Sequence, residues 1–114
     1  MNDKIVNLMQ FSRKAGKLVS GLEACIRGIN HQQIRLLIVA EDTSDRTKNN
    51  IIRSNNSNSN PVKMIFTGTQ REISYALGLP VTGVFGISDK NFAAKIMEYW
   101  QMTHSGGSFA DTSS

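Results

Sequence analysis

The run Leu36–Ala40 constrains the fold more than any other part of the sequence. It reads Leu-Leu-Ile-Val-Ala and contains no polar residue. A strand that is apolar on both of its faces needs cover on both faces, which is typical of a central strand in a sheet between two layers of helices. The sequence therefore predicts a central strand here, with helices on either side of the sheet.

Apolar runs and helical periodicity predict the other elements of the fold. Further strands are expected at Leu18–Val19, Val62–Phe66 and Val81–Ile87. Helices are expected over Asp3–Lys14, from Ser20 onward, through Ile51 and Ile52, from Thr69 to Gly78, and over Asp89–Gln101. Strands that alternate with helices predict an α/β fold, a three-layer α/β/α sandwich around a central mixed sheet of about four strands.

Local signals predict where several of these helices begin and end. Gly16 suits the left-handed residue that ends many helices. Ser20–Glu23 and Thr69–Glu72 both match the capping box, in which a hydroxyl and a carboxylate satisfy free backbone donors at a helix start. Ser54–Pro61 is rich in Asn and Ser, which compete for backbone hydrogen bonds, and it is expected to be a loop.

The length of 114 residues fits one domain. We expect this domain to span residues 1–101 and a disordered Gly- and Ser-rich tail to span residues 102–114. No apolar run approaches the ~18 residues of a membrane span, and the N-terminus lacks a signal-peptide pattern, so we expect a cytoplasmic protein that does not associate with membranes. The lone cysteine, Cys25, falls in an apolar helical pattern and is interpreted as a core residue.

The charge balance favours a polyanionic partner. The chain has 13 Lys and Arg against 9 Asp and Glu, a net charge of +4, and an isoelectric point near 9.5. The first quarter of the chain carries a cluster of these cations: Lys4, Arg13, Lys14, Lys17 and Arg27. A solubilising surface explains the same composition, so the charge alone leaves both interpretations open.

Signatures of catalysis and of metal or cofactor binding are missing from the sequence. It contains no GxGxxG, GxxxxGK[ST], GxSxG, HExxH or paired CxxC motif. His31 and His104 have no ligand or nucleophile nearby in the sequence, and Glu41-Asp42 is better explained as a helix-capping pair than as an acid and base. We expect neither an enzyme nor a cofactor or metal site.

The basic cluster is the strongest functional candidate from the residues alone. Arg13, Lys14 and Lys17 precede a predicted helix start, whose free N–H groups and partial positive charge also favour phosphate. Arg27 follows Glu23 by one helical turn. It either forms a surface ion pair with Glu23 or reaches a phosphate or base edge, and the spacing does not decide between them.

Two segments resemble a known family. Arg13–Gly21, which contains the pattern KxVSG, and Leu36–Asp42, which ends in Ala-Glu-Asp, are followed by Lys48. Together they resemble the YlxQ-like bacterial branch of the kink-turn-binding ribosomal-protein superfamily, and the resemblance extends from about Ile5 to Met97. It implies a sandwich fold that binds RNA through three turns, here Lys17–Arg27, Asp42–Arg46 and Leu79–Thr82.

The resemblance also implies roles for individual residues. Gly21 would permit close backbone approach to guanine edges, and Leu79, Pro80 and Val81 would contact bases turned out of a kink, unless they only pack the loop on the domain. Kink-turn binders commonly have Gly-(Thr or Asn)-Asn-Glu where this chain has Gly21–Ala24, and the capping box is the preferred explanation of Glu23. The expected RNA-binding residues are Arg13, Lys14, Lys17, Ser20, Gly21, Leu22, Glu23, Arg27, Asp42, Arg46, Leu79, Pro80, Val81 and Thr82.

The function expected from the sequence is therefore noncatalytic binding of structured RNA in a ribosome-associated or regulatory role. Kink-turn RNA and ribosomal RNA are the expected RNA classes, and ribosomal or RNA-associated proteins are the expected protein partners. The alternative is a protein–protein interaction module that uses the same turns and binds RNA only as any basic protein does.

Overall fold

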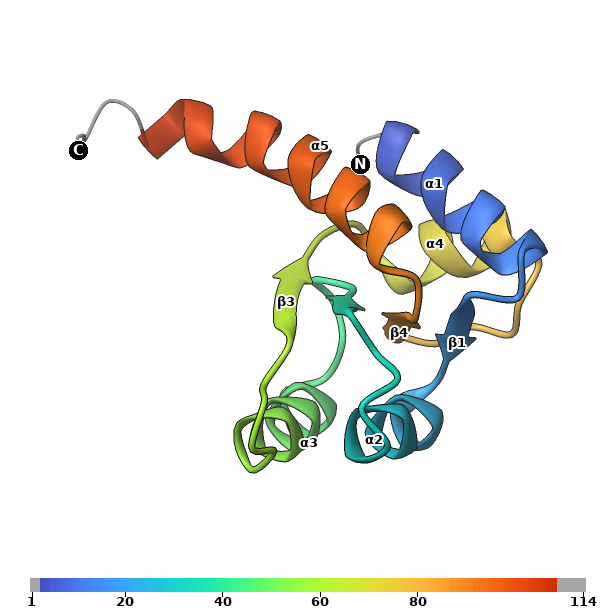
Figure 1. The fold of residues 1–114 in the computed structure, drawn as a ribbon. Coiled ribbons are helices and arrows are strands. Elements are labelled where there is room, and N and C mark those ends of the chain that lie inside the picture. Colours follow the sequence, from blue (N-terminus) through green and yellow to red (C-terminus); the bar gives the residue numbers. More distant parts are fainter. Residues whose placement is uncertain (1–2, 109–114) are drawn as a thin grey trace.

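The computed structural model describes residues 3–108, which form five helices and four strands (Figure 1). The helices are α1 (Asp3–Lys14), α2 (Leu22–Asn30), α3 (Asp45–Asn56), α4 (Gln70–Leu77) and α5 (Lys90–Ser108). The strands are β1 (Leu18–Ser20), β2 (Leu36–Val39), β3 (Lys63–Phe66) and β4 (Val84–Ile87). Helices and strands alternate along most of the chain, as the sequence predicts.

The sheet is mixed and lies between two helical layers. Its strand order is β1-β4-β2-β3, with β4 antiparallel to both of its neighbours and β3 parallel to β2. Helices α2 and α3 cover one face, and α1, α4 and α5 cover the other (Figure 1). The predicted α/β/α sandwich with a four-stranded mixed sheet is confirmed.

Strand β2 lies in the interior of the sheet because both of its faces are apolar. All four of its residues are buried. Leu36 and Ile38 pack with α1, α4 and α5, whereas Leu37 and Val39 pack with α2 and α3. Successive side chains of a strand point to opposite faces, so one uninterrupted apolar run supplies both cores.

Several predicted helix ends are confirmed. The bounds of α1 are those predicted, and Gly16 beyond it has φ 73°, in the left-handed region. At the start of α4, the Thr69 hydroxyl accepts from the Glu72 amide at 3.1 Å and the Glu72 carboxylate accepts from the Thr69 amide at 3.1 Å. This is the predicted capping box, and Gly78 ends the helix with φ 68°.

The capping box predicted at Ser20 is wrong. Ser20 is the last residue of β1, paired with Phe85, and the N-cap of α2 is Gly21, which makes no side-chain cap. The chain leaves the strand at Gly21 with φ 98°, a backbone conformation that residues with a Cβ rarely adopt. Glu23 therefore takes no part in a cap.

The loop predicted at Ser54–Pro61 begins later than expected. Helix α3 continues to Asn56, and Asn55 is buried and makes two hydrogen bonds to the backbone of Val62, at 2.8 and 3.0 Å. Asn58 donates to the carbonyl of Ile29 near the end of α2 at 3.0 Å. Asn55 thus binds backbone beyond its own helix, and Asn58 binds α2 as well as the nearby Asn60 amide, contacts that local propensity does not reveal.

Helix α5 extends to Ser108, beyond the predicted end at Gln101. A docked helix lengthens at little cost, because each added residue gains a hydrogen bond without a new nucleation step. Thus the first part of the tail predicted over 102–114 is helical, and residues 109–114 lie outside the described residues. No described helix combines the length and apolar composition needed to cross a membrane.

Candidate nucleic-acid interface

Three turns meet at one edge of the sheet. They are the turn between β1 and α2 (Ser20–Leu22), the turn between β2 and α3 (Ala40–Ser44) and the loop between α4 and β4 (Gly78–Gly83). Because β4 is antiparallel to β1 and β2, it begins where they end. We call this region the three-turn edge, and it contains parts of all three segments that the family resemblance implied.

Backbone hydrogen bonds join the three turns. The Gly21 amide donates to the Val84 carbonyl at 2.8 Å, and the Ala40 amide donates to the Gly83 carbonyl at 2.8 Å. The buried Thr43 hydroxyl also donates to the Gly83 carbonyl at 3.3 Å. Gly83 has no room for a side chain, because an added Cβ would overlap the Thr43 side chain. The turns therefore form one connected surface.

The loop before β4 is held by a serine of α4. Ser74 is buried; its hydroxyl accepts from the Thr82 amide at 3.0 Å and donates to the Thr82 carbonyl at 3.2 Å. These bonds explain why β4 begins at Val84 rather than at the predicted Val81. Leu79 packs against the core, whereas Pro80 is exposed and Val81 is 54% exposed. Only the last two are available for apolar contact.

The start of α2 offers free backbone donors at this edge. No side chain caps the helix, and its first backbone acceptor, the Gly21 carbonyl, bonds to the Cys25 amide at 3.1 Å. The amides of Leu22, Glu23 and Ala24 therefore have no partner within the helix. Such a helix start attracts anions through its N–H groups and its dipole.

Arg27 and Glu23 do not form the surface ion pair that their spacing allowed. Both side chains are exposed, and among residues 3–108 no ion pair joins them, whereas Lys95 and Glu98 of α5 do form one, at 3.7 Å. The guanidinium of Arg27 is therefore not neutralised by its neighbour. It lies on α2, one turn beyond the free amides.

The structure does not bring Arg13, Lys14 and Lys17 to the start of α2. Arg13 donates to the carbonyl of Leu77 and so caps the end of α4. Lys17 lies at the opposite end of β1 from Gly21, where its carbonyl accepts from the Ser88 amide at 2.9 Å. Residues close in sequence are separated here because an extended strand lies between them.

Asp42 caps a helix, although not the one that follows it. Its carboxylate accepts from the amide of Gln70, the first residue of α4, at 2.9 Å, and the Gln70 side chain donates back to the Asp42 carbonyl at 3.2 Å. Helix α3 is capped instead by Ser44, and Arg46 is exposed in its first turn. Asp42 thus ties the three-turn edge to α4.

We expect Asp42→Ala to lower the free energy of unfolding by about 1 kcal/mol, because it removes a charged acceptor from a helix start. Glu41→Ala is the matched control, since Glu41 is an exposed acid beside Asp42, outside any helix, whose side chain has no hydrogen bond within residues 3–108. Urea unfolding measures both. Equal stability of the two variants would mean that the bond to Gln70 contributes nothing.

Cys25 is confirmed as a core residue. Its side chain is buried, and burial raises the pKa of the thiol to about 12. The thiol therefore stays protonated at neutral pH, and a protonated, buried thiol is neither a nucleophile nor a metal ligand.

Sequence reasoning missed the residues that shape this edge. Thr43 and Gly83 contact each other across two turns, and Ser74 of α4 binds the Thr82 backbone, so local patterns reveal little of these contacts. One signal was present: Gly83 interrupts an apolar run, and a glycine in a strand pattern often marks close approach of another backbone.

Comparison with known proteins supports both the fold and the family resemblance. Residues 3–97 match the family described as the ribosomal protein L7Ae/L30e/S12e/Gadd45 family. The RNA-binding protein YlxQ of Enterococcus faecium is 34% identical over 95 residues, which cover 83% of this chain and 89% of that protein.

Two solved structures share the fold. A protein of unknown function from Bacillus halodurans superposes with a TM-score of 0.77 at 22% identity, covering 85% of this chain and 96% of that one. The 15.5kD RNA binding protein of Giardia lamblia superposes with a TM-score of 0.67 at 19% identity, covering 87% of this chain and 89% of that one. At these identities the likeness concerns the fold alone.

Proposed function

Because this chain belongs to the ribosomal protein L7Ae/L30e/S12e/Gadd45 family, we propose that it binds structured RNA through the three-turn edge, without catalysis. The observation that carries the proposal is the uncapped start of α2 at this edge, with the unneutralised Arg27 one turn beyond it. Free amides and a guanidinium together suit an RNA backbone. The connected turns keep them in a fixed arrangement, which lowers the entropic cost of binding.

Each part of the edge has a role in the proposed complex. Gly21 lets the backbone approach the RNA closely, and the amides that follow it bind phosphate or base edges. Glu23, free of any cap, accepts from guanine amino and imino groups. Pro80 and Val81 provide apolar contact to unstacked bases, and Arg46 neutralises a phosphate.

We propose kink-turn RNA as the preferred class. A kink exposes guanine edges and unstacked bases at one place, and such irregular sites are what sequence-specific RNA recognition uses. The three-turn edge offers polar donors and an exposed apolar tip side by side. We further propose a ribosome-associated or regulatory role, with ribosomal RNA and ribosomal or RNA-associated proteins as partners.

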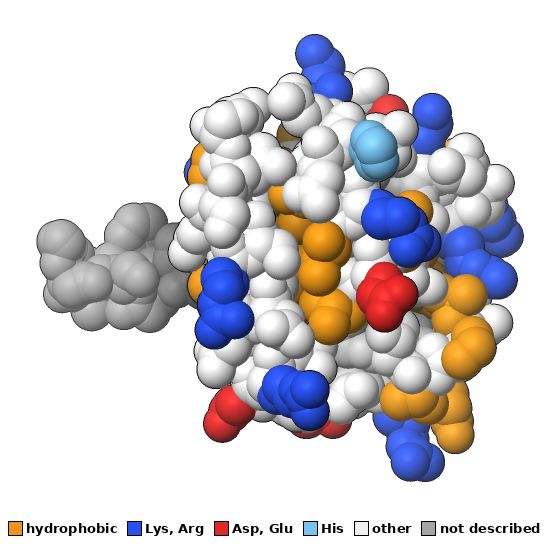
Figure 2. Space-filling view, turned by 90° about the horizontal axis from the view of Figure 1, so that it is seen from below, with side chains coloured by type: hydrophobic (Ala, Val, Ile, Leu, Met, Phe, Trp, Pro, Cys, Tyr) orange, Lys and Arg blue, Asp and Glu red, His pale blue; other side chains and the backbone are white. Residues whose placement is uncertain are grey.

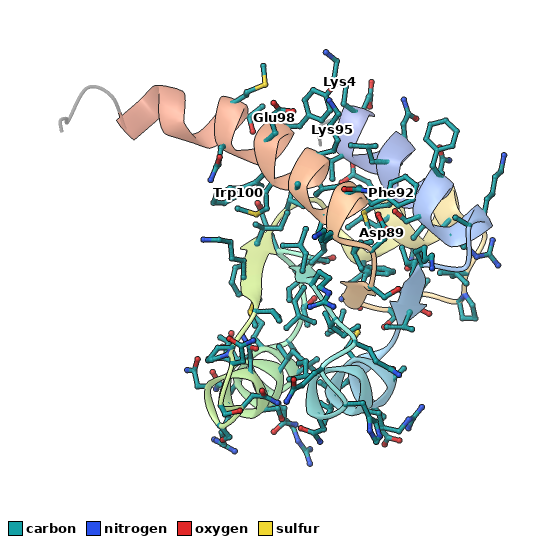
Figure 3. All side chains as sticks on the ribbon, in the orientation of Figure 1. Lys4, Asp89, Phe92, Lys95, Glu98 and Trp100 are labelled. Carbon is teal, nitrogen blue, oxygen red and sulfur yellow. The ribbon has the colours of Figure 1, made fainter. Side chains whose placement is uncertain are left out.

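Binding to a kink-turn RNA and to a matched duplex without the G·A pairs, across a salt series, tests this function. We expect preference for the kink-turn, and a loss in Arg27→Ala of about 1.5–3 kcal/mol, the range for a hydrogen bond to a charged group. Lys95→Ala is the control, because Lys95 lies on α5, on the other side of the sheet from α2 (Figure 3).

Equal, weak binding to both RNAs by the protein and by Arg27→Ala would contradict the proposal. It would leave only the sequence-independent attraction that any basic protein has for RNA. The search would then move to other RNAs or to a protein partner of the three-turn edge, the alternative that the sequence leaves open.

A further inference from the structure

A second basic site lies beside edge strand β1, away from the three-turn edge. A hollow of about 740 Å³ opens between β1, α2 and the start of β2. Its wall includes Lys17, Arg27, His31 and Arg35. We call it the β1–α2 hollow. In Figure 2, which looks onto the α2 and α3 layer, a histidine lies beside a basic side chain on this face.

The sheet register explains why cations from separate segments meet in this hollow. Lys17 precedes β1 and Arg35 precedes β2, on either side of β4, so the two positions are about 10 Å apart, or two strand spacings. Lys17 shares a sheet face with Val19, and Arg35 shares one with Leu37, because side chains alternate along a strand. Val19 and Leu37 lie on the same face of the sheet, the one that packs against α2 and α3, and α2 carries Arg27.

The base of the hollow is closely packed. Ile34 is 3% exposed and lies between α2 and β4, where a Cβ added at Gly28 would be 2.6 Å from its Cγ1 and one at Gly86 would be 2.8 Å from its Cδ1. Both glycines allow the close approach that seats Ile34. Well-packed elements therefore hold the backbones that carry the cations.

The charges in the hollow are not balanced. No Asp or Glu contributes to its wall, and among residues 3–108 no ion pair involves Lys17, Arg27 or Arg35. Two acids lie nearby, outside this wall: exposed Glu23 one turn before Arg27 on α2, and Asp89, whose carboxylate accepts from the Phe92 amide at 2.9 Å at the start of α5 (Figure 3). Three like charges facing one hollow repel one another, and a bound anion relieves this repulsion.

We propose that the β1–α2 hollow binds a phosphate of the RNA backbone, in the duplex that leads away from the three-turn edge. This inference rests on the proposed function. Lys17 and Gly21 are separated by β1, about 13 Å of extended chain, so the hollow contacts a phosphate several nucleotides from those at the start of α2. Arg27 lies between the two sites and connects them.

Arg35→Ala tests the hollow, because Arg35 is exposed and lies outside the three-turn edge. Two RNAs carry the same kink-turn, one with a flanking duplex too short to reach the hollow and one with a duplex that extends past it. For the long RNA we expect Arg35→Ala to weaken binding about tenfold, with the slope of log K against log salt reduced by about 0.7–0.9. Arg35→Lys should restore the slope, and binding of the short RNA should not change.

Lys95→Ala controls for net charge, because it also removes one positive charge from the protein. If both variants weaken binding of the long RNA equally, or if Arg35→Ala weakens neither RNA, the hollow does not contact the duplex. If the protein still recognises the short RNA in that case, the proposed function stands. Failure of the phosphate site and failure of the proposed function are therefore distinguishable.

A titration with inorganic phosphate distinguishes a phosphate of the RNA backbone from a free phosphorylated ligand. It is followed by the NMR shifts of the backbone amides of Arg35 and Ser88. We expect saturable shifts in the wild-type protein that are lost in Arg35→Ala. No saturable shift would overturn the phosphate site. Saturable shifts in a protein that binds neither RNA would reject the duplex contact and the proposed function, and would assign the hollow to a free phosphorylated ligand.

Discussion

Replacing Gly83 with Ala is expected to lower the free energy of unfolding by about 3 kcal/mol, the upper part of the range for overpacking a buried site. The added methyl group would overlap the Thr43 hydroxyl and lie 3.0 Å from its Cβ and 3.1 Å from its Cγ2. The turn that contains Thr43 and the loop that contains Gly83 cannot move apart easily, because the Gly83 carbonyl is hydrogen-bonded to both Ala40 and Thr43. The three turns would have to separate, so we also expect RNA affinity to fall.

The same substitution in a Thr43→Ala background isolates the contact. Thr43→Ala removes the overlapping hydroxyl and leaves only its Cβ near the new methyl group. We expect Gly83→Ala to cost about 1 kcal/mol in that background, a coupling of about 2 kcal/mol between the two sites. Urea unfolding of the four proteins measures it. Equal costs in both backgrounds would show that Thr43 does not confine Gly83.

Phe85→Ala is expected to lower the free energy of unfolding by about 3–5 kcal/mol, the range for removing a buried aromatic ring. Phe85 is fully buried on β4 and packs in the core that α1, α4 and α5 share with the sheet. Its backbone also pairs with both β1 and β2, so neighbouring chain cannot readily collapse into the cavity.

Val81→Ala is the matched control for Phe85→Ala. Val81 precedes the same strand but is 54% exposed, so its truncation should change stability by no more than about 0.5 kcal/mol. Thermal and urea unfolding compare the two variants. Similar small effects from both would mean that the core around Phe85 is loosely packed, contrary to the structure.

The sequence predicts those parts of the fold that local patterns determine. The apolar run of β2, the periodicity of α1 and the capping box at Thr69 each depend on residues within one element. Each of these signals is carried by residues adjacent in the sequence, although the packing that stabilises the element forms only in the folded chain. For this reason the layer architecture and the bounds of α1 and α4 could be predicted from the sequence alone.

The sequence predicts less of the site, because long-range contacts decide it. Asp42 looks like a cap for α3, yet it binds an amide 28 residues away. Arg13 looks like a free cation, yet it caps α4 from 64 residues away. Ser20 has the composition of a helix cap, but pairing with Phe85 keeps it in a strand. In each case tertiary contacts override local propensity.

Arg35 illustrates a further limit. It lies next to the apolar run that predicts the central strand, and nothing in its neighbours indicates a ligand. Only the strand order places Arg35 near Lys17, with β4 between the two residues. Helix α2 then brings Arg27 to the same hollow. A charge cluster assembled from three separate elements can be recognised only once the topology is known.

Backbone amide shifts of the ¹⁵N-labelled protein, titrated with the kink-turn RNA, test the RNA surface most directly. We predict that the largest shifts occur at Gly21–Arg27, Val81 and Thr82, since Pro80 has no amide N–H, and that α5 shifts little because it covers the other face of the sheet. Saturable shifts centred on α1 and α5, with the three-turn edge unperturbed, would contradict the account.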